Sequence, residues 1–258
     1  MDGPVTERDL PVSKAVPDAD AGTDADARRA ALLEPLFADR RLWRGQHGAS
    51  ADGIPSGHAA LDAVLPDGGF PDAALTEVFV PGVAPSAGPL AGLLAGIGEL
   101  ALVLPALARL ARGLRLIAFV APPELPYAPA LAAAGIDLDR LVVVRARDAR
   151  DAAWAAEQAL RDGGCAAVVA WLEGHEKKKG SSPDLPLRRL QLAAEAGECW
   201  GLLYRPWAAR RSASPAALRL ALTPVAGGLC VEVLKCRGSS VRRTVEVPLA
   251  DAFAIGRG

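Results

Sequence analysis

The chain has 258 residues, of which 51% are hydrophobic and only 5% aromatic, with a formal net charge of -1. This supplies enough apolar material for one substantial core, so we expect one main domain. The longest apolar segment, residues 89–110, contains Glu99, Pro105 and Arg109, and this pattern argues against a membrane-spanning helix. Acidic residues stand where a signal peptide would carry basic ones, which predicts a cytoplasmic protein.

The N-terminal fifth of the chain is predicted to lie outside the main domain. Residues 1–25 are acidic, contain proline and lack apolar periodicity, so they are expected to form a disordered tail. Residues 26–50 read as a helix, with Gly45 as its stop signal, followed by a linker. Trp and Arg dominate interface hot spots, although Trp43 could equally hold the helix against the domain. The candidate partner-binding residues of this segment are Leu42, Trp43 and Arg44.

Residues 51–250 are predicted to form the α/β domain, and residues 251–258 a short C-terminal tail. Short strands joined by helices predict a mostly parallel central sheet covered by helices on both faces. Its strands are expected at LTEVFV, LRLIAFV, RLVVVRA, CAAVVAWL and WGLLYRP. The period-2 runs ALRLALTPV, LCVEVLKC and RRTVEVPL then predict antiparallel strands at the C-terminal end. LTEVFV is expected inside the sheet and not at an exposed edge.

Four crossover helices are predicted between these strands. The first covers residues 88–113 with a kink at Pro105, and the second begins near residue 126 and stops at Gly135. The third is capped by Asp148 and closed by Gly163 or Gly164, with Asp151 and Glu157 on its solvated face. The fourth covers residues 187–197.

The four cysteines and three histidines show no zinc-binding spacing, so no metal site is predicted. Between the first strand and the first crossover helix, a loop resembles a phosphate-binding loop. Such a loop needs Gly-x-x-x-x-Gly-Lys-Ser/Thr, since the lysine reaches the outer phosphates and the hydroxyl holds magnesium. Pro89 and Leu90 stand at those two positions, and no lysine occurs between Lys14 and Lys177. The loop is predicted to keep the curved backbone of a phosphate-binding loop but to lack the lysine and the hydroxyl that hold a nucleotide and its magnesium. No cofactor is therefore expected. The glycines of this degenerate region are Gly82, Gly88, Gly96 and Gly98.

Gly96 and Gly98 have two interpretations. They could bring the backbone close to an anion at a helix N-terminus, which would be a weak site. We favour the alternative that they permit close helix packing, because short glycine patterns are unspecific.

The segment SGHAALDAVLPDGGFPDAALTEVFVPG resembles the start of the RecA ATPase core, and FVAPPELPYAPALAAAGIDLDRL resembles a later RecA segment. With LWRG, GIGEL, APPELPYAPAL, WAAEQAL and RRLQLAAE, the chain is similar to the ImuA family over residues 26–250. These are RecA-like proteins encoded beside bacterial error-prone polymerases. The resemblance implies a RecA-like core for the α/β domain.

The chain departs from an active RecA at three catalytic positions. Besides the altered loop, the catalytic Glu expected after the second strand falls on or beside Pro123, with Glu124 displaced by one. The Walker B Asp is replaced at the end of the fourth strand, where Ala170 and Trp171 stand. These groups position and stabilise the transferred phosphoryl group. The expectation is therefore a scaffold without enzymatic activity.

The resemblance implies a non-catalytic adaptor of a translesion-synthesis complex in the DNA-damage (SOS) response. The implied partners are an inactive Y-family-like polymerase and a replicative-type error-prone polymerase, with RecA and single-stranded DNA as further candidates and no membrane. Two alternatives remain. One is a DNA-dependent ATPase of the recombinase type, which nucleotide binding would reveal. The other is a cell-division inhibitor resembling SulA, which would associate with a division GTPase.

Basic residues gather in the C-terminal third, where residues 176–258 carry 14 Lys and Arg against 7 Asp and Glu. This excess predicts an acidic partner or nucleic acid, although ordinary solubilising charges would look the same. Two basic segments, EGHEKKKGSSPDLP and RPWAARRSASP, occupy the places of the RecA DNA-binding loops. The resemblance likens Lys235 and Arg237 to residues that touch nucleotide on a neighbouring subunit, here expected to meet a partner or solvent. The nucleic-acid or partner-binding candidates are Lys177, Lys178, Lys179, Arg205, Arg210, Arg211, Lys235 and Arg237.

Overall fold

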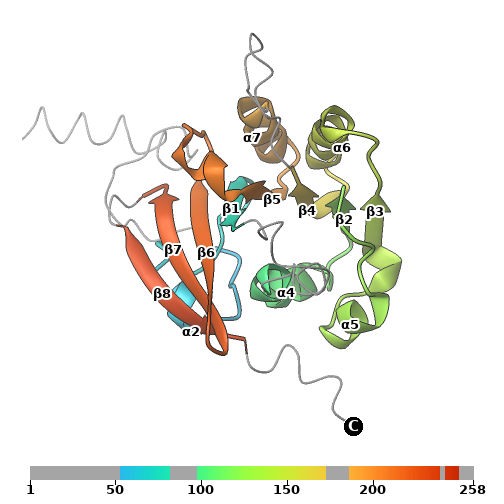
Figure 1. The fold of residues 1–258 in the computed structure, drawn as a ribbon. Coiled ribbons are helices and arrows are strands. Elements are labelled where there is room, and N and C mark those ends of the chain that lie inside the picture. The colour runs from blue at the N-terminus through green and yellow to red at the C-terminus, as the bar shows by residue number, and fades with distance from the viewer. Residues whose placement is uncertain (1–52, 82–97, 173–185, 239–241, 250–258) are drawn as a thin grey trace, which may run out of the picture. The chain divides into compact units, whose positions relative to one another are not determined.

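The computed structural model describes residues 53–81, 98–172, 186–238 and 242–249, which all belong to one compact unit of the chain (Figure 1). The predictions for the N-terminal tail and helix, most of the degenerate phosphate loop and the lysine-rich segment lie outside these residues. None of the helices in the described part is long and apolar enough to span a membrane. The site residues outside the description are Leu42, Trp43, Arg44, Gly82, Gly88, Gly96, Lys177, Lys178 and Lys179.

A single eight-stranded sheet organises the described residues, in the order β3-β2-β4-β5-β1-β6-β7-β8. All neighbours from β3 to β6 pair in parallel, while β7 is antiparallel to both β6 and β8. The prediction of a mostly parallel sheet with antiparallel C-terminal pairing is confirmed. The strands are β1 (Leu75–Val80), β2 (Leu116–Val120), β3 (Leu141–Val144), β4 (Cys165–Trp171), β5 (Trp200–Pro206), β6 (Leu218–Val225), β7 (Gly228–Cys236) and β8 (Arg243–Pro248).

Helices cover both faces of this sheet, as predicted. Figure 1 places α4 and α5 on one face and α6 and α7 on the other, and the buried side chains form two separate clusters accordingly. Strand β1 lies between β5 and β6, so LTEVFV is internal and nearly all of it is buried. The helices are α2 (Ala59–Asp62), α4 (Glu99–Leu110), α5 (Ala128–Ala133), α6 (Ala149–Arg161) and α7 (Leu187–Ala196), with 3-10 turns η2 (Leu138–Arg140) and η3 (Trp207–Arg211).

Helix α6 begins as the sequence predicts, but one of its carboxylates lies elsewhere than expected. The Asp148 side chain caps the helix by accepting hydrogen bonds from the backbone N–H groups of Arg150 and Asp151, both at 2.8 Å. Glu157, predicted on the solvated face, is only 2% exposed and forms ion pairs with Arg161 and Arg189. The expectation for Glu157 was wrong because α7 packs beside α6 and covers that position.

The first crossover helix also differs from its prediction. Gly98, taken as part of a helix over residues 88–113, has φ 87° and stands at the N-cap of α4. This left-handed conformation is incompatible with a continuous right-handed helix, and glycine adopts it without a steric cost. Gly98 therefore marks a helix start, and the prediction of one continuous helix over residues 88–113 is wrong at this position.

Helix α4 contains Pro105, and a loop packs against it there. Gly57 has φ 84°, and a Cβ atom at this residue would lie 2.4 Å from the Pro105 Cβ atom, so only glycine fits. The neighbouring His58 donates from Nε2 to the Leu102 carbonyl oxygen at 3.1 Å, and it also interacts with the Ala101 carbonyl. Proline has no N–H to bond to the Ala101 carbonyl. His58 thus ties the loop to α4 one residue from the carbonyl that Pro105 leaves without its usual donor.

The burial of His58 predicts that stability depends on pH. Burial lowers the pKa of His58 below its ordinary value of 6.5, against opposing contributions from the Leu102 and Ala101 carbonyls and Asp62. The unfolded chain then binds the proton more readily than the folded chain, so stability is complete above about pH 6.5 and falls as the pH drops below it. Urea unfolding at pH 7.5 and pH 5.5 should show a larger loss for the wild type than for His58→Gln. An equal loss of stability between pH 7.5 and pH 5.5 in both proteins would show that His58 does not cause the pH dependence.

Candidate functional site: a basic row around Glu77

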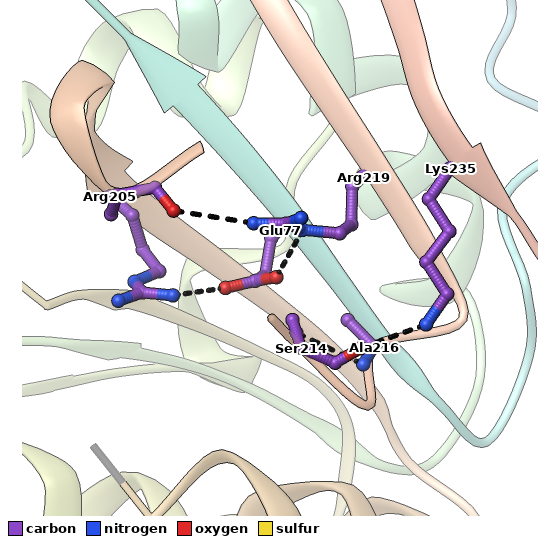
Figure 2. Close-up of polar contacts among 7 residues, drawn as sticks. Glu77, Arg205, Ser214, Ala216, Arg219 and Lys235 are labelled. Atoms are coloured by element: carbon purple, nitrogen blue, oxygen red, sulfur yellow. Dashed lines mark hydrogen bonds and ion pairs between the residues drawn. The ribbon is translucent and has the colours of Figure 1, made fainter. Parts of the chain in front are cut away.

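Charged side chains form a row across four neighbouring strands, on the sheet face that carries α6 and α7. Glu77 of β1 lies opposite Arg219 of β6, and Arg219 lies opposite Lys235 of β7. On the other side of β1, Arg205 of β5 lies opposite Phe79, two residues beyond Glu77. Residues opposite one another on adjacent strands project from the same face. Figure 2 shows Glu77 between the two arginines, with Lys235 at the end of the row.

Glu77 is the centre of this row, which we call the basic row (Glu77, Arg205, Arg219 and Lys235). Its carboxylate is fully buried and accepts hydrogen bonds from Arg205 Nη1 and, at 2.8 Å, from Arg219 Nε. The Arg219 guanidinium also lies 4.8 Å from the centre of the Phe79 ring. A buried carboxylate with two guanidinium partners avoids the large cost of an unpaired buried charge.

Lys235 adds a third positive charge to the row. Its Nζ donates to the Ser214 carbonyl oxygen at 2.9 Å. The pKa of Lys235 is lowered, first by burial and then by Arg219 and Arg237, while Glu77 opposes the shift. Three cations therefore share one carboxylate, and the row keeps an excess of positive charge.

The turn η3 brings further basic residues to the row. Arg219 donates to the carbonyl oxygen of Ala209, within η3, at 3.3 Å. The Arg210 guanidinium lies 4.2 Å from the centre of the Trp207 ring, and Arg210 also donates to the Trp207 carbonyl at 3.2 Å. Arg211 is exposed. The segment RPWAARRSASP, expected to join positive charge to flexible small residues, thus begins with the last two residues of β5 and continues as a 3-10 turn held against the sheet.

The structure brings together several of the basic residues predicted from the sequence. Arg210 and Arg211 lie in η3, which Arg219 bonds through Ala209, and Lys235 bonds to Ser214 just beyond η3. Arg237 reaches Glu195 of α7, with 3.7 Å between Nη2 and Oε1. Arg205 lies beneath this surface, 8% exposed, with its guanidinium bonded to Glu77, so it supports the site and does not present a free charge.

Sequence reasoning missed Glu77 and Arg219 as members of the site. They are 142 residues apart in the chain, and only the pairing of β1 with β6 joins them. A signal existed nonetheless, because LTEVFV, ALRLALTPV and WGLLYRP each carry one charge inside an apolar strand. Charges are almost never fully buried unless they are paired. Three such strands therefore indicate a shared ionic contact.

A second feature lies on the opposite face, where β2, β4 and β5 carry a layer of aromatic rings. Trp171, the last residue of β4, stacks on Tyr204 with 5.3 Å between ring centres. Phe119 meets Trp171 edge-on, with 5.5 Å between ring centres. The Tyr204 hydroxyl donates to the Glu99 carbonyl oxygen at 2.8 Å, in the first turn of α4. Burial raises the pKa of Tyr204 well above its usual range, which keeps this donor protonated.

The aromatic layer (Phe119, Trp171 and Tyr204) occupies a place where α/β proteins commonly bind ligands. Ligands of open parallel sheets bind beyond the carboxyl ends of the strands. A magnesium-bound nucleoside triphosphate needs an oxygen ligand for the metal there, directly or through water. At the end of β4 the chain offers the Trp171 ring, packed against its neighbours. These residues do not fit such a complex.

Comparisons with known proteins show no family for this chain. No family model matches the chain, and no curated protein matches it. Among solved structures, the crystal structure of SulA from Pseudomonas aeruginosa is similar over 50% of this chain and 97% of that chain. The sequence identity is 24% and the TM-score is 0.35. At that score the likeness leaves the function open.

Proposed function

We propose that this protein is a non-catalytic adaptor of an error-prone polymerase complex in the DNA-damage response, and that its basic row and η3 contact single-stranded DNA. The observation that carries the non-catalytic part is Trp171. It stands where the RecA resemblance implies a metal-binding carboxylate, and it is stacked into the aromatic layer with Tyr204 and Phe119.

The aromatic layer supports a scaffold role on physical grounds. Phosphoryl transfer depends on charges placed around the reacting phosphate, and an apolar ring cannot provide one. Trp171 is held from two sides by ring contacts, and Tyr204 ties the layer to α4. The aromatic layer, which stands where the resemblance implies groups for phosphoryl transfer, therefore also joins the sheet to α4. Stabilising contacts in the place of catalytic groups are expected of a protein that serves as a scaffold.

The DNA-binding part is supported by the combination of charge and aromatic surface at η3. Single-stranded nucleic acids are bound by cationic grooves that track the phosphates and by rings on which bases stack. Arg210 stacks on the partly exposed Trp207, Arg211 follows it in η3 and is exposed, and Lys235 bonds to Ser214 just beyond η3. In the described part of the chain, no ion pair links Lys235 to a carboxylate. The partner identities rest on the sequence resemblance alone.

Nucleotide turnover separates the adaptor from the recombinase-type ATPase. Purified protein should show no ATP hydrolysis with or without single-stranded DNA, and no calorimetric signal with millimolar ATP and magnesium. A matched control is Trp171→Phe, which keeps a ring in the layer and should behave identically. A turnover that survives purification and disappears in Glu124→Gln would restore the ATPase reading, with Glu124 as the displaced catalytic carboxylate.

Partner choice is tested by co-purification. The tagged full chain should retain the inactive Y-family-like polymerase and the replicative-type polymerase encoded beside it when the three are co-expressed. Retention of a division GTPase in place of these polymerases would support the inhibitor resembling SulA and overturn the adaptor.

A further inference from the structure

The two edges of the sheet are built differently. Exposed strand edges invite pairing with other chains, and proteins usually protect them with charges or proline. Strand β8 carries such protection, since it contains Arg243, Glu246 and Pro248. Strand β3 at the other edge has the sequence LVVV, with neither charge nor proline. Within the described residues, no strand pairs with its outer side.

Exposed apolar side chains concentrate near this unprotected edge. The described residues include nine large hydrophobic side chains that are exposed. Four of them lie in β3 or in the connection from β2 to β3, and the most exposed of the four is Tyr127, at 73%. Exposed apolar groups in β3 and in the segment leading to it favour an interaction at this edge. The four residues are Leu125, Tyr127, Leu138 and Val142.

Charges of opposite sign stand at the two ends of β3. Asp139 lies two residues before the strand and Arg145 directly follows it, and both are exposed. Their neighbours Arg140 and Arg147 are already engaged, with Asp137 and Asp151 respectively. Among the described residues, the side chains of Asp139 and Arg145 have no such partner. The edge thus offers one acidic and one basic end around an apolar centre.

We propose that β3 pairs with β3 of a second copy of this chain, antiparallel and about a two-fold axis at Val142, so that one sheet runs through a dimer. Val142 is three residues from both Asp139 and Arg145. Antiparallel pairing about it therefore brings the end of each β3 that follows η2, with Asp139 in that turn, to the end of the other copy that is followed by Arg145, twice per dimer. A two-fold interface must be self-complementary in this way. The dimer does not depend on the adaptor role.

The charge pattern allows a test that separates pairing from folding. Asp139→Arg and Arg145→Asp each turn both attractive contacts into repulsive ones. Each variant should raise the dimer dissociation constant of the full chain on the order of tenfold, measured by sedimentation. An equimolar mixture of the two variants should form a heterodimer as tight as the wild-type dimer, because both contacts become attractive again. Circular dichroism should show the same spectrum for all three proteins, which would mean that the fold of each copy is unchanged.

Val142→Lys provides an independent measurement. Val142 is 41% exposed, so the fold should tolerate the change, whereas two lysines would meet at the axis and abolish the dimer. The proposal is overturned if the wild type sediments as a monomer at every accessible concentration, or if Val142→Lys remains dimeric. It is also overturned if mixing the two charge variants restores nothing. If the wild type is a monomer and an extended peptide binds along β3, the partner of this edge is a different protein and not a second copy of this chain.

Discussion

Glu77→Gln should destabilise the protein by about 3–5 kcal/mol, because it leaves two guanidinium groups buried without an opposing charge. Arg205 and Arg219 are both 8% exposed, so water cannot replace the lost carboxylate. A typical domain is stable by only about 5–15 kcal/mol, and the loss is a large part of that total. Urea unfolding at neutral pH measures the change directly.

Two further variants show whether the ionic contact is responsible. Glu246→Gln changes an exposed glutamate of β8 and should alter stability by no more than about 0.5 kcal/mol. Replacing Glu77, Arg205 and Arg219 together by leucine should recover much of the lost stability, since apolar groups often replace a complete buried ion pair without loss. If Glu77→Gln and Glu246→Gln were equally stable, the central role of Glu77 would be wrong.

Removing basic side chains from η3 and from the lysine-rich segment predicted to bind DNA should have the largest effect on binding. Replacing Arg210 and Arg211 by Ala, together with Lys177, Lys178 and Lys179, should weaken binding to an oligothymidine strand on the order of a hundredfold at low salt. Each lost phosphate contact should also lower the slope of log affinity against log salt by about 0.7. Fluorescence anisotropy across a salt series measures both quantities.

A matched pair of variants separates specific contacts from total charge. Arg210→Ala with Arg211→Ala removes two charges beside the basic row, whereas Arg112→Ala with Arg150→Ala removes two exposed charges elsewhere. Only the first pair should weaken the binding and flatten its salt dependence. Equal losses in the two pairs would mean that η3 is not the DNA surface. An unaltered protein without DNA affinity at low salt would contradict the surface altogether.

Much of the architecture could be predicted because it depends on local patterns. Alternating apolar strands and amphipathic helices indicate a covered parallel sheet, and Asp148 announces the start of α6 through its own backbone contacts. Glu157 shows the limit of such reasoning. Its burial depends on Arg189 in a helix 32 positions away along the chain, which no local pattern around α6 reveals.

The candidate site was predictable only in part for the same reason. The sequence indicated Lys235, Arg210 and Arg211 as basic residues near strand ends. It did not indicate Glu77, the carboxylate at the centre of the basic row. Glu77 meets Arg205 and Arg219 through the pairing of β1 with two strands from the far end of the chain. Strand order and register depend on how whole helices and strands pack, so a single charge inside LTEVFV indicates a partner without naming it.

The central position of β1 bears on how the chain is synthesised. Its neighbours β5 and β6 come late: Trp200 follows Val80 by 120 residues. At a translation rate of about 5–20 residues per second, β1 leaves the ribosome on the order of ten seconds before either neighbour exists. During that interval the apolar segment LTEVFV has both edges open and Glu77 without its arginines. Folding of the sheet centre must therefore wait for the C-terminal third, and until then the open edges of β1 make the nascent chain prone to aggregation.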